Sequence, residues 1–199
     1  MVNKFTLRVA NSEKRKASPM VTIELYKEWW VDQVTKLILD IQQNEFRIPV
    51  TINDQPDLLS IQDFYSKGKG NFWVAVDGEC VVGTIGLIDI DNGQSALRKM
   101  FVHKDYRGKE KRVGQLLLDT VIIWCRKKEI NEIYLGTIDI LVAAQQFYLK
   151  NGFVEVEKRN LPVNFPVMRV DNRFFKLWIG ENDNTKSAYH DPHSNRHRK

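Results

Sequence analysis

Residues 100–117 read MFVHKDYRGKEKRVGQLL and join three local patterns. The stretch starts as the end of an apolar strand, passes through a loop (103–112) with five Lys or Arg and two acidic residues, and ends in the first turn of an amphipathic helix. Such a turn presents unpaired backbone N–H groups and the positive end of the helix dipole. Glycine lets the main chain approach a ligand and basic side chains add charge, so the pattern is typical of a diphosphate-binding loop.

A basic loop alone is more often a solvated surface segment, so the elements around it matter. Upstream, apolar alternation predicts a strand at 21–25. Apolar runs rich in β-branched residues, with turns at Asp77-Gly78 and Asp91-Asn92-Gly93, predict further strands at 72–76, 80–90 and 95–102. Three-to-four-residue spacing predicts helices at 28–43 and near 58–65. Downstream, we expect a helix from Val113, a strand at 132–137, a helix at 140–150 with Asp139 as N-cap, and strands at 152–156 and 173–179. This order predicts an α/β domain around one central sheet.

The composition is that of a globular protein, with 199 residues, 43% of them hydrophobic and 28% charged. We expect one domain at 20–179, between a flexible basic segment at 1–19 and a disordered polar and basic tail at 180–199. No apolar run approaches the roughly 20 residues that span a bilayer, and the N-terminus lacks the apolar core of a secretory signal. These features favour a cytoplasmic protein.

The net charge of +5 is concentrated at the two ends of the chain. Residues 1–18 carry five Lys or Arg and one Glu, and residues 180–199 carry four Lys or Arg and three acidic residues, so the body between them is neutral. A neutral body gives little support to a nucleic-acid-binding face. Binding of nucleic acid through the basic ends stays an alternative, and it would weaken steeply with salt.

Histidine and cysteine spacings do not predict a metal site. His190, His193 and His197 lie in a polar segment that Asp191-Pro192 keeps from forming a helix. Cys80 and Cys125 each lack a second cysteine at metal-ligand spacing, so we expect no metal.

The stretch at 100–117 and a second one at 147–153 resemble the landmarks of the GNAT superfamily of acetyl-CoA-dependent N-acetyltransferases. The first landmark is matched by Met100-Phe101-Val102 at a strand end, Arg107-Gly108 in the loop and Val113-Gly114-Gln115-Leu116-Leu117 in the helix. The second landmark, Phe-Tyr-x-x-x-Gly-Phe, stands at 147–153. The loop departs from the family pattern at Arg112, which takes the place of its first glycine, at Lys109, where Gln or Arg is usual, and at Lys104, which replaces a proline.

The resemblance implies a mixed, mostly antiparallel sheet of six to seven strands flanked by about four helices. In this fold the sheet splays between its fourth and fifth strands, here 95–102 and 132–137, and acetyl-CoA binds along the exposed edge of the fourth. The implied coenzyme contacts are Met100, Phe101, Val102, Arg107, Gly108, Lys109, Arg112, Val113, Gly114 and Gln115.

The resemblance also implies direct attack of a primary amine on the thioester in a ternary complex. Tyr148 matches the family tyrosine that protonates the departing thiolate, although a half-buried packing role is the alternative. The amine must lose a proton, because a lysine-like amine has a pKa of about 10.4. Glu45 is the first candidate for the base, while Asp89 and Asp91 also suit turn and capping roles.

The acceptor is expected to be a small-molecule or peptide amine, and relatives of this type often form homodimers. A non-catalytic module that binds or senses acyl-CoA is the alternative from another functional class. The altered loop at Arg112 permits this alternative, whereas the retained Tyr148 argues against it.

Overall fold

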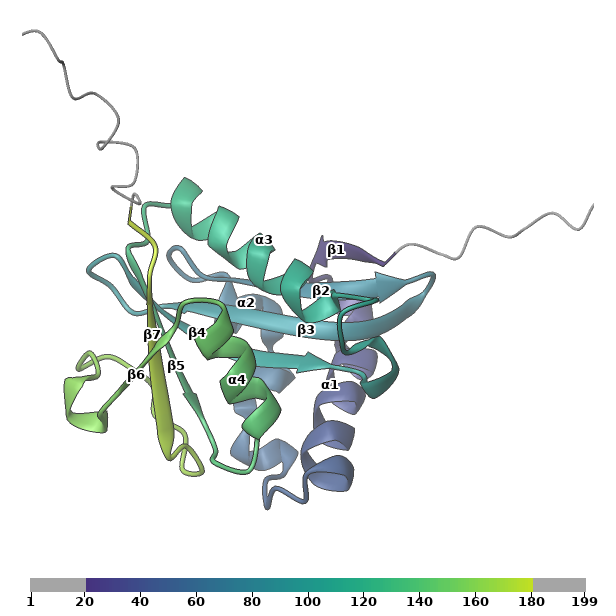
Figure 1. Cartoon of the computed structure of the whole chain (residues 1–199). Helices are drawn as coiled ribbons and strands as arrows, with labels where there is room; N and C mark the ends of the chain where they lie inside the picture. The colour runs from purple at the N-terminus through teal and green to yellow at the C-terminus, as the bar shows by residue number, and fades with distance from the viewer. Residues whose placement is uncertain (1–20, 181–199) are drawn as a thin grey trace, which may run out of the picture.

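Seven strands form one sheet in the computed structural model, which describes residues 21–180 (Figure 1). The strand order is β1-β2-β3-β4-β5-β7-β6, and every neighbouring pair is antiparallel except β4 and β5. The strands are β1 (Thr22–Leu25), β2 (Asn71–Asp77), β3 (Cys80–Asp89), β4 (Gln94–Val102), β5 (Glu132–Thr137), β6 (Val154–Val156) and β7 (Arg173–Trp178). This arrangement confirms the mostly antiparallel sheet that the resemblance implies.

Four α-helices cover the two faces of this sheet: α1 (Val31–Leu39), α2 (Ile61–Tyr65), α3 (Val113–Lys127) and α4 (Val142–Lys150). Figure 1 shows α3 and α4 on one face, with α1 and α2 on the other. Short 3-10 turns occur at Glu28–Trp30, Ile52–Asp54, Pro56–Leu59, Lys104–Tyr106 and Lys158–Asn160, and a π-helical turn at Asp40–Glu45 extends α1.

Strand β2, which lies between β1 and β3, shows why the sheet is covered on both sides. Phe72 and Val74 pack in the apolar cluster beneath α1 and α2, while Trp73 and Ala75 pack in the cluster beneath α3. Because alternate side chains point to opposite faces, a strand covered twice is buried continuously, as Phe72–Val76 is.

The sheet splays between β4 and β5. These parallel strands pair only where Gln94, Ser95 and Ala96 face Glu132, Ile133 and Tyr134. Beyond this point the strands diverge, and the β5-facing backbone edge of the second half of β4 has no partner strand among residues 21–180. The predicted opening of the sheet is therefore present.

A bulge in β4 lies inside this opening. The register shifts so that Lys99 and Met100 together face Ile85 of β3, and Lys99 has a positive φ of 51°. The Thr84 hydroxyl donates a 2.7 Å hydrogen bond to the Lys99 carbonyl oxygen, which helps to hold the bulge. A bulge of this kind redirects the side chains of its strand.

Several predicted local features were wrong in detail. The hairpin between β2 and β3 turns at Gly78-Glu79, not at Asp77-Gly78, because only Gly78 has a positive φ (63°) and Asp77 still pairs with Cys80. Asp139 is not the N-cap of α4. A turn closed by the Leu141 N–H on the Ile138 carbonyl delays the helix, so Leu141 is the N-cap residue.

The predicted helix at 28–43 forms as three successive helical segments of different pitch, a 3-10 turn, the α-helix α1 and a π-helical turn, which end at Glu45, two residues later than expected. The expectations for residues 1–19 and for the tail after Gly180 lie outside the described residues. Between residues 21 and 180, none of the helices combines the length and the apolar character needed to cross a membrane.

Candidate active site

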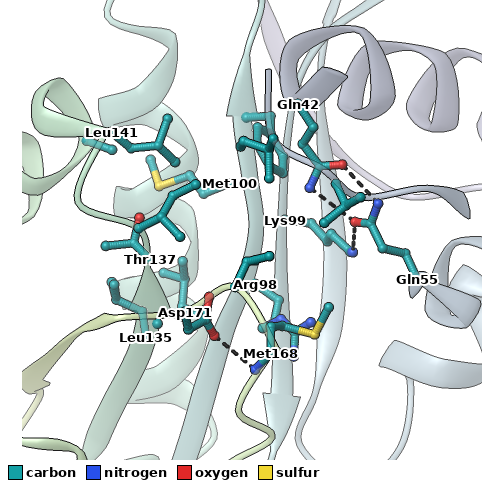
Figure 2. Close-up of a pocket in the computed structure, with 18 of the residues that line it drawn as sticks. Gln42, Gln55, Arg98, Lys99, Met100, Leu135, Thr137, Leu141, Met168 and Asp171 are labelled. Carbon is teal, nitrogen blue, oxygen red and sulfur yellow. Dashed lines mark hydrogen bonds between the residues drawn. The ribbon is translucent and has the colours of Figure 1, made fainter. Parts of the chain in front are cut away.

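A cavity of about 110 Å³ opens where β4 and β5 diverge (Figure 2). Its walls come from the middle of β4, the end of β5, the start of α4, the segment after α1 and the loop before β7. The lining residues are Gln42, Ile48, Val50, Gln55, Leu97, Arg98, Lys99, Met100, Phe101, Leu135, Gly136, Thr137, Ile138, Leu141, Ala144, Tyr148, Met168, Val170 and Asp171.

Tyr148 of α4 lines this cavity from the α3 side of the sheet. Its ring packs against Phe147, Phe153 and Phe175, with centroid separations of 5.9, 5.4 and 6.2 Å. The hydroxyl makes no hydrogen bond to any side chain or backbone group of residues 21–180. Burial raises the pKa of the phenol above its usual value, so it keeps its proton at neutral pH.

Lys99 forms a buried ion pair on the opposite wall. Its Nζ lies 2.5 Å from Gln55 Oε1 and 3.3 Å from Asp57 Oδ2, and the two charged side chains are only 4% and 6% exposed. Asp57 also accepts a 2.7 Å hydrogen bond from the Tyr65 hydroxyl, and Gln55 bonds reciprocally to Gln42. Burial lowers the pKa of Lys99 to about 8, although Asp57 acts to raise it.

Asp171 brings a carboxylate to the third wall. Its Oδ2 accepts a 3.0 Å hydrogen bond from the Met168 N–H, and the carboxylate lies over the backbone of Gly136, where any Cβ would collide with it. Burial raises the pKa of Asp171, against the lowering effects of the Met168 N–H, Arg98 and Lys99. A carboxylate with a raised pKa in a small cavity is a candidate proton acceptor.

The predicted phosphate loop lies at the end of β4. Arg107 donates from Nε to the Val102 carbonyl oxygen (2.7 Å) and from both terminal nitrogens to the Glu45 carboxylate. Arg112, at the N-cap position of α3, has φ 52° and ψ 21°. It therefore adopts the left-handed conformation that glycine accepts most easily, at the position where the family pattern has glycine.

The remaining predicted contacts surround this helix start. Val113 is buried under the sheet, and Gln115 ties α3 to α4 by donating to the Asn151 side chain at 2.8 Å. Gly108 has a φ of 94° and nothing near its missing side chain, and Gly114 faces Met100 and Phe147 across 3.8 Å. Lys109 is exposed.

The structure brings together some of the predicted site residues and separates others. The cavity is lined by Met100, Phe101 and Tyr148. Glu45 does not line it, and its carboxylate is instead paired with Arg107. Asp89 and Asp91 also lie outside the lining. They have the turn roles that were the alternative: Asp89 accepts hydrogen bonds from the backbone N–H groups of Lys69 and Asp91.

Sequence reasoning missed Arg98, Lys99 and Asp171. The first two stand in a strand pattern in which a basic pair indicates only a solvent-facing edge. Asp171 lies just after the proline-containing segment 161–168, and these prolines, which favour a loop over a strand, were the local signal near it.

Comparisons with known proteins agree with this geometry. Residues 68–155 match the family model of the acetyltransferase (GNAT) domain. The chain is 36% identical over 111 residues to the probable N-acetyltransferase camello of Xenopus tropicalis and 29% identical over 112 residues to streptothricin acetyltransferase A of Bacillus subtilis (strain 168). These matches take in 53% and 56% of this chain, but only 49% and 63% of the two relatives.

A solved structure gives a fuller match. The crystal structure of a GNAT-family acetyltransferase from Staphylococcus aureus Mu50 superposes with a TM-score of 0.77 and 45% identity, covering 80% of this chain and 99% of that one. A relative at this identity, matched along almost its whole length, shows the family of this chain. The chain therefore belongs to the GNAT family of acetyltransferases.

Proposed function

We propose that this protein transfers an acetyl group from acetyl-CoA to a primary amine, which attacks directly within a ternary complex. The observation that carries the proposal is the juxtaposition of a cavity that holds Tyr148 and Asp171 with an edge of β4 that pairs with no strand of residues 21–180. The edge offers backbone groups to an extended ligand, and the cavity offers groups that can move protons.

The residues present suit acetyl-CoA. The main chain of Met100, Phe101 and Val102 would pair with the amide groups of the pantetheine arm along the open edge. The diphosphate would be held by Arg107, Gly108, Lys109 and Arg112 and by the first-turn backbone of α3, from Val113 through Gly114 to Gln115. That first turn contains no acidic residue to oppose an anion.

Acetyl-CoA supplies an acetyl group activated as a thioester. A backbone N–H of β4 near Val102 would stabilise the negative charge that develops on the acetyl oxygen, an effect worth about 3 kcal/mol in comparable sites. Tyr148, protonated and without a hydrogen-bond partner among the described residues, would give its proton to the departing sulfur.

Asp171 is the proton acceptor that the cavity favours. Its raised pKa makes it a stronger base than an ordinary carboxylate, and it faces the same space as Tyr148. Glu45, which the sequence ranks first, remains the alternative. Its partnership with Arg107 suits a role at the coenzyme loop better than a role at the amine.

Thermal unfolding with and without acetyl-CoA tests the coenzyme part of the proposal. A ligand at about 100 times its dissociation constant, bound only to the folded state, adds roughly 2.7 kcal/mol to the free energy of unfolding. We expect a clear rise in Tm that is lost in the Arg107→Ala, Arg112→Ala double variant and kept in Arg126→Ala, which changes an exposed residue of α3. No rise at millimolar acetyl-CoA would refute the proposal.

Turnover separates the enzyme from a module that only binds acyl-CoA. Release of free coenzyme thiol, measured with a panel of amines, is expected in the wild-type protein and strongly reduced in Tyr148→Phe. Coenzyme binding without thiol release for any amine would favour the binding module.

A further inference from the structure

The bulge in β4 places two consecutive basic residues at one cavity. In a regular strand Arg98 and Lys99 would point to opposite faces of the sheet. The left-handed conformation of Lys99 turns its side chain toward Asp57, and both residues line the same space. Their charges also act on a common neighbour, because Arg98 and Lys99 both act to lower the pKa of the Asp171 carboxyl.

Only one of these two cations is neutralised. Lys99 has Asp57 as a counter-ion and Gln55 as a hydrogen-bond acceptor. Arg98 is half-buried, and its one hydrogen bond within residues 21–180 goes to the Pro166 carbonyl oxygen, at 3.2 Å. No carboxylate of this described region lies within 4.0 Å of its guanidinium.

Arg98 and Asp171 interact through their charges, but no hydrogen bond or ion pair joins the two side chains. Arg98 lowers the pKa of Asp171 through its charge, but the carboxylate takes its hydrogen bond from the Met168 N–H. Figure 2 shows Arg98 between Asp171 and Lys99. The cavity therefore holds a guanidinium with unused donors and a separate carboxylate, which together complement a molecule with one anionic and one amine group.

We propose that the acceptor is a small amino acid, whose carboxylate is bound by Arg98 and whose amine is received by Asp171. This inference rests on the proposed acetyl transfer and specifies its substrate class. A guanidinium matches a carboxylate through two parallel hydrogen bonds, and it stays charged at every physiological pH. The cavity of about 110 Å³ admits a small molecule more readily than a bulky one.

The test compares each of the twenty common amino acids with its own carboxamide, at saturating acetyl-CoA, by release of free coenzyme thiol. The amide keeps the amine and the side chain and removes only the negative charge. It also lowers the pKa of the α-amine, so more of the amine is neutral, and this bias works against the proposal. We expect at least one amino acid to exceed its amide more than ten-fold in kcat/KM.

The Arg98→Gln variant supplies the second comparison. The ratio of kcat/KM between that amino acid and its amide should fall toward one, chiefly through KM, and Arg98→Lys should restore part of it. Arg126→Gln, which removes an exposed arginine of α3, should keep the wild-type ratio. O-phosphoethanolamine tests whether a phosphate replaces the carboxylate, and its preference over every amino acid would overturn the proposal.

The failures of the two proposals are distinguishable. If amides or carboxylate-free amines such as cadaverine are acetylated as well as amino acids, the acetyl transfer stands and the inference about Arg98 is wrong. If Arg98→Gln lowers kcat/KM for acid and amide alike, Arg98 is structural and the inference is also wrong. If no amine of any class releases thiol, the proposed function fails, and the inference fails with it.

Discussion

The guanidinium of Arg107 forms a two-point ion pair with the carboxylate of Glu45, 62 positions earlier in the chain, with Nη2 at 2.8 Å from Oε2. The same guanidinium donates from Nε to the Val102 carbonyl oxygen. Arg107 thus links the end of the first helical segment to the end of β4 and to the loop proposed to hold the coenzyme. A diphosphate that reaches this loop meets an arginine already engaged by an anion.

Replacing Glu45 by Gln should therefore tighten coenzyme binding. Both side chains are about one-third exposed, and pairs of this kind contribute at most about 1 kcal/mol. Freeing Arg107 should lower the Kd of acetyl-CoA by up to about five-fold in calorimetric titration. Glu157→Gln, which breaks the exposed pair with Arg159, is the matched control. A kcat loss of a hundred-fold with unchanged Kd would instead identify Glu45 as the base.

The Tyr148→Phe variant should separate chemistry from packing. The hydroxyl has no hydrogen-bond partner within residues 21–180, so its removal should change the free energy of unfolding by less than about 0.5 kcal/mol. Loss of a general acid should lower kcat about 100-fold.

Tyr134→Phe is the control for Tyr148→Phe, because the Tyr134 hydroxyl donates to Glu132 at 2.9 Å outside the cavity. It should cost stability and leave kcat unchanged. If Tyr148→Phe keeps full activity, the tyrosine is a packing residue.

The Asp171→Asn variant should have a higher free energy of unfolding than the wild type at neutral pH. It should also lose the high activity that the wild type keeps above the pKa of Asp171. Burial disfavours the ionised carboxylate, so its pKa is higher in the folded than in the unfolded chain, despite Arg98, Lys99 and Lys158 nearby. Stability must then fall as pH rises from the unfolded value of 3.8 through the raised folded value.

Urea titrations of wild type and Asp171→Asn at pH 4 and pH 7 measure this effect. The free energy of unfolding of the variant, taken relative to that of the wild type, should be higher at pH 7 than at pH 4. In the wild type, kcat/KM should drop as pH falls through the same range, because a base must be ionised. A pH–rate profile that keeps this limb in the variant would remove Asp171 from the mechanism.

The order of strands and helices along the chain was predictable because it depends on local pattern. The continuous apolar run at 72–76 and the spacing from Val113 onward report burial directly. The cavity was not predictable in this way. Lys99 in a left-handed conformation has no compositional signature, and its partner Asp57 is 42 positions away in a different element. Asp171 reaches the site only because Gly136 leaves room for it.

Variants of Arg112 can measure the energetic cost of a residue other than glycine at this position of the family pattern. Its φ of 52° is the conformation that a glycine adopts at little cost, whereas a residue with a Cβ pays about 1 kcal/mol. Arg112→Gly and Arg112→Ala both remove the guanidinium and differ only in the ability to adopt this φ. Their difference in unfolding free energy therefore isolates the cost of the backbone conformation.

We expect Arg112→Gly to be more stable than Arg112→Ala by about 1 kcal/mol in urea titrations at equal ionic strength. The same pair of substitutions at Arg126, in the last turn of α3, should show the opposite order, since glycine costs up to about 1 kcal/mol relative to alanine within a helix. Both Arg112 variants should bind acetyl-CoA more weakly than wild type. The alanine variant should bind more weakly of the two, because it is less able to hold the left-handed conformation with which the loop enters α3. Equal stability of the two would show that the loop relaxes to another conformation when the arginine is removed.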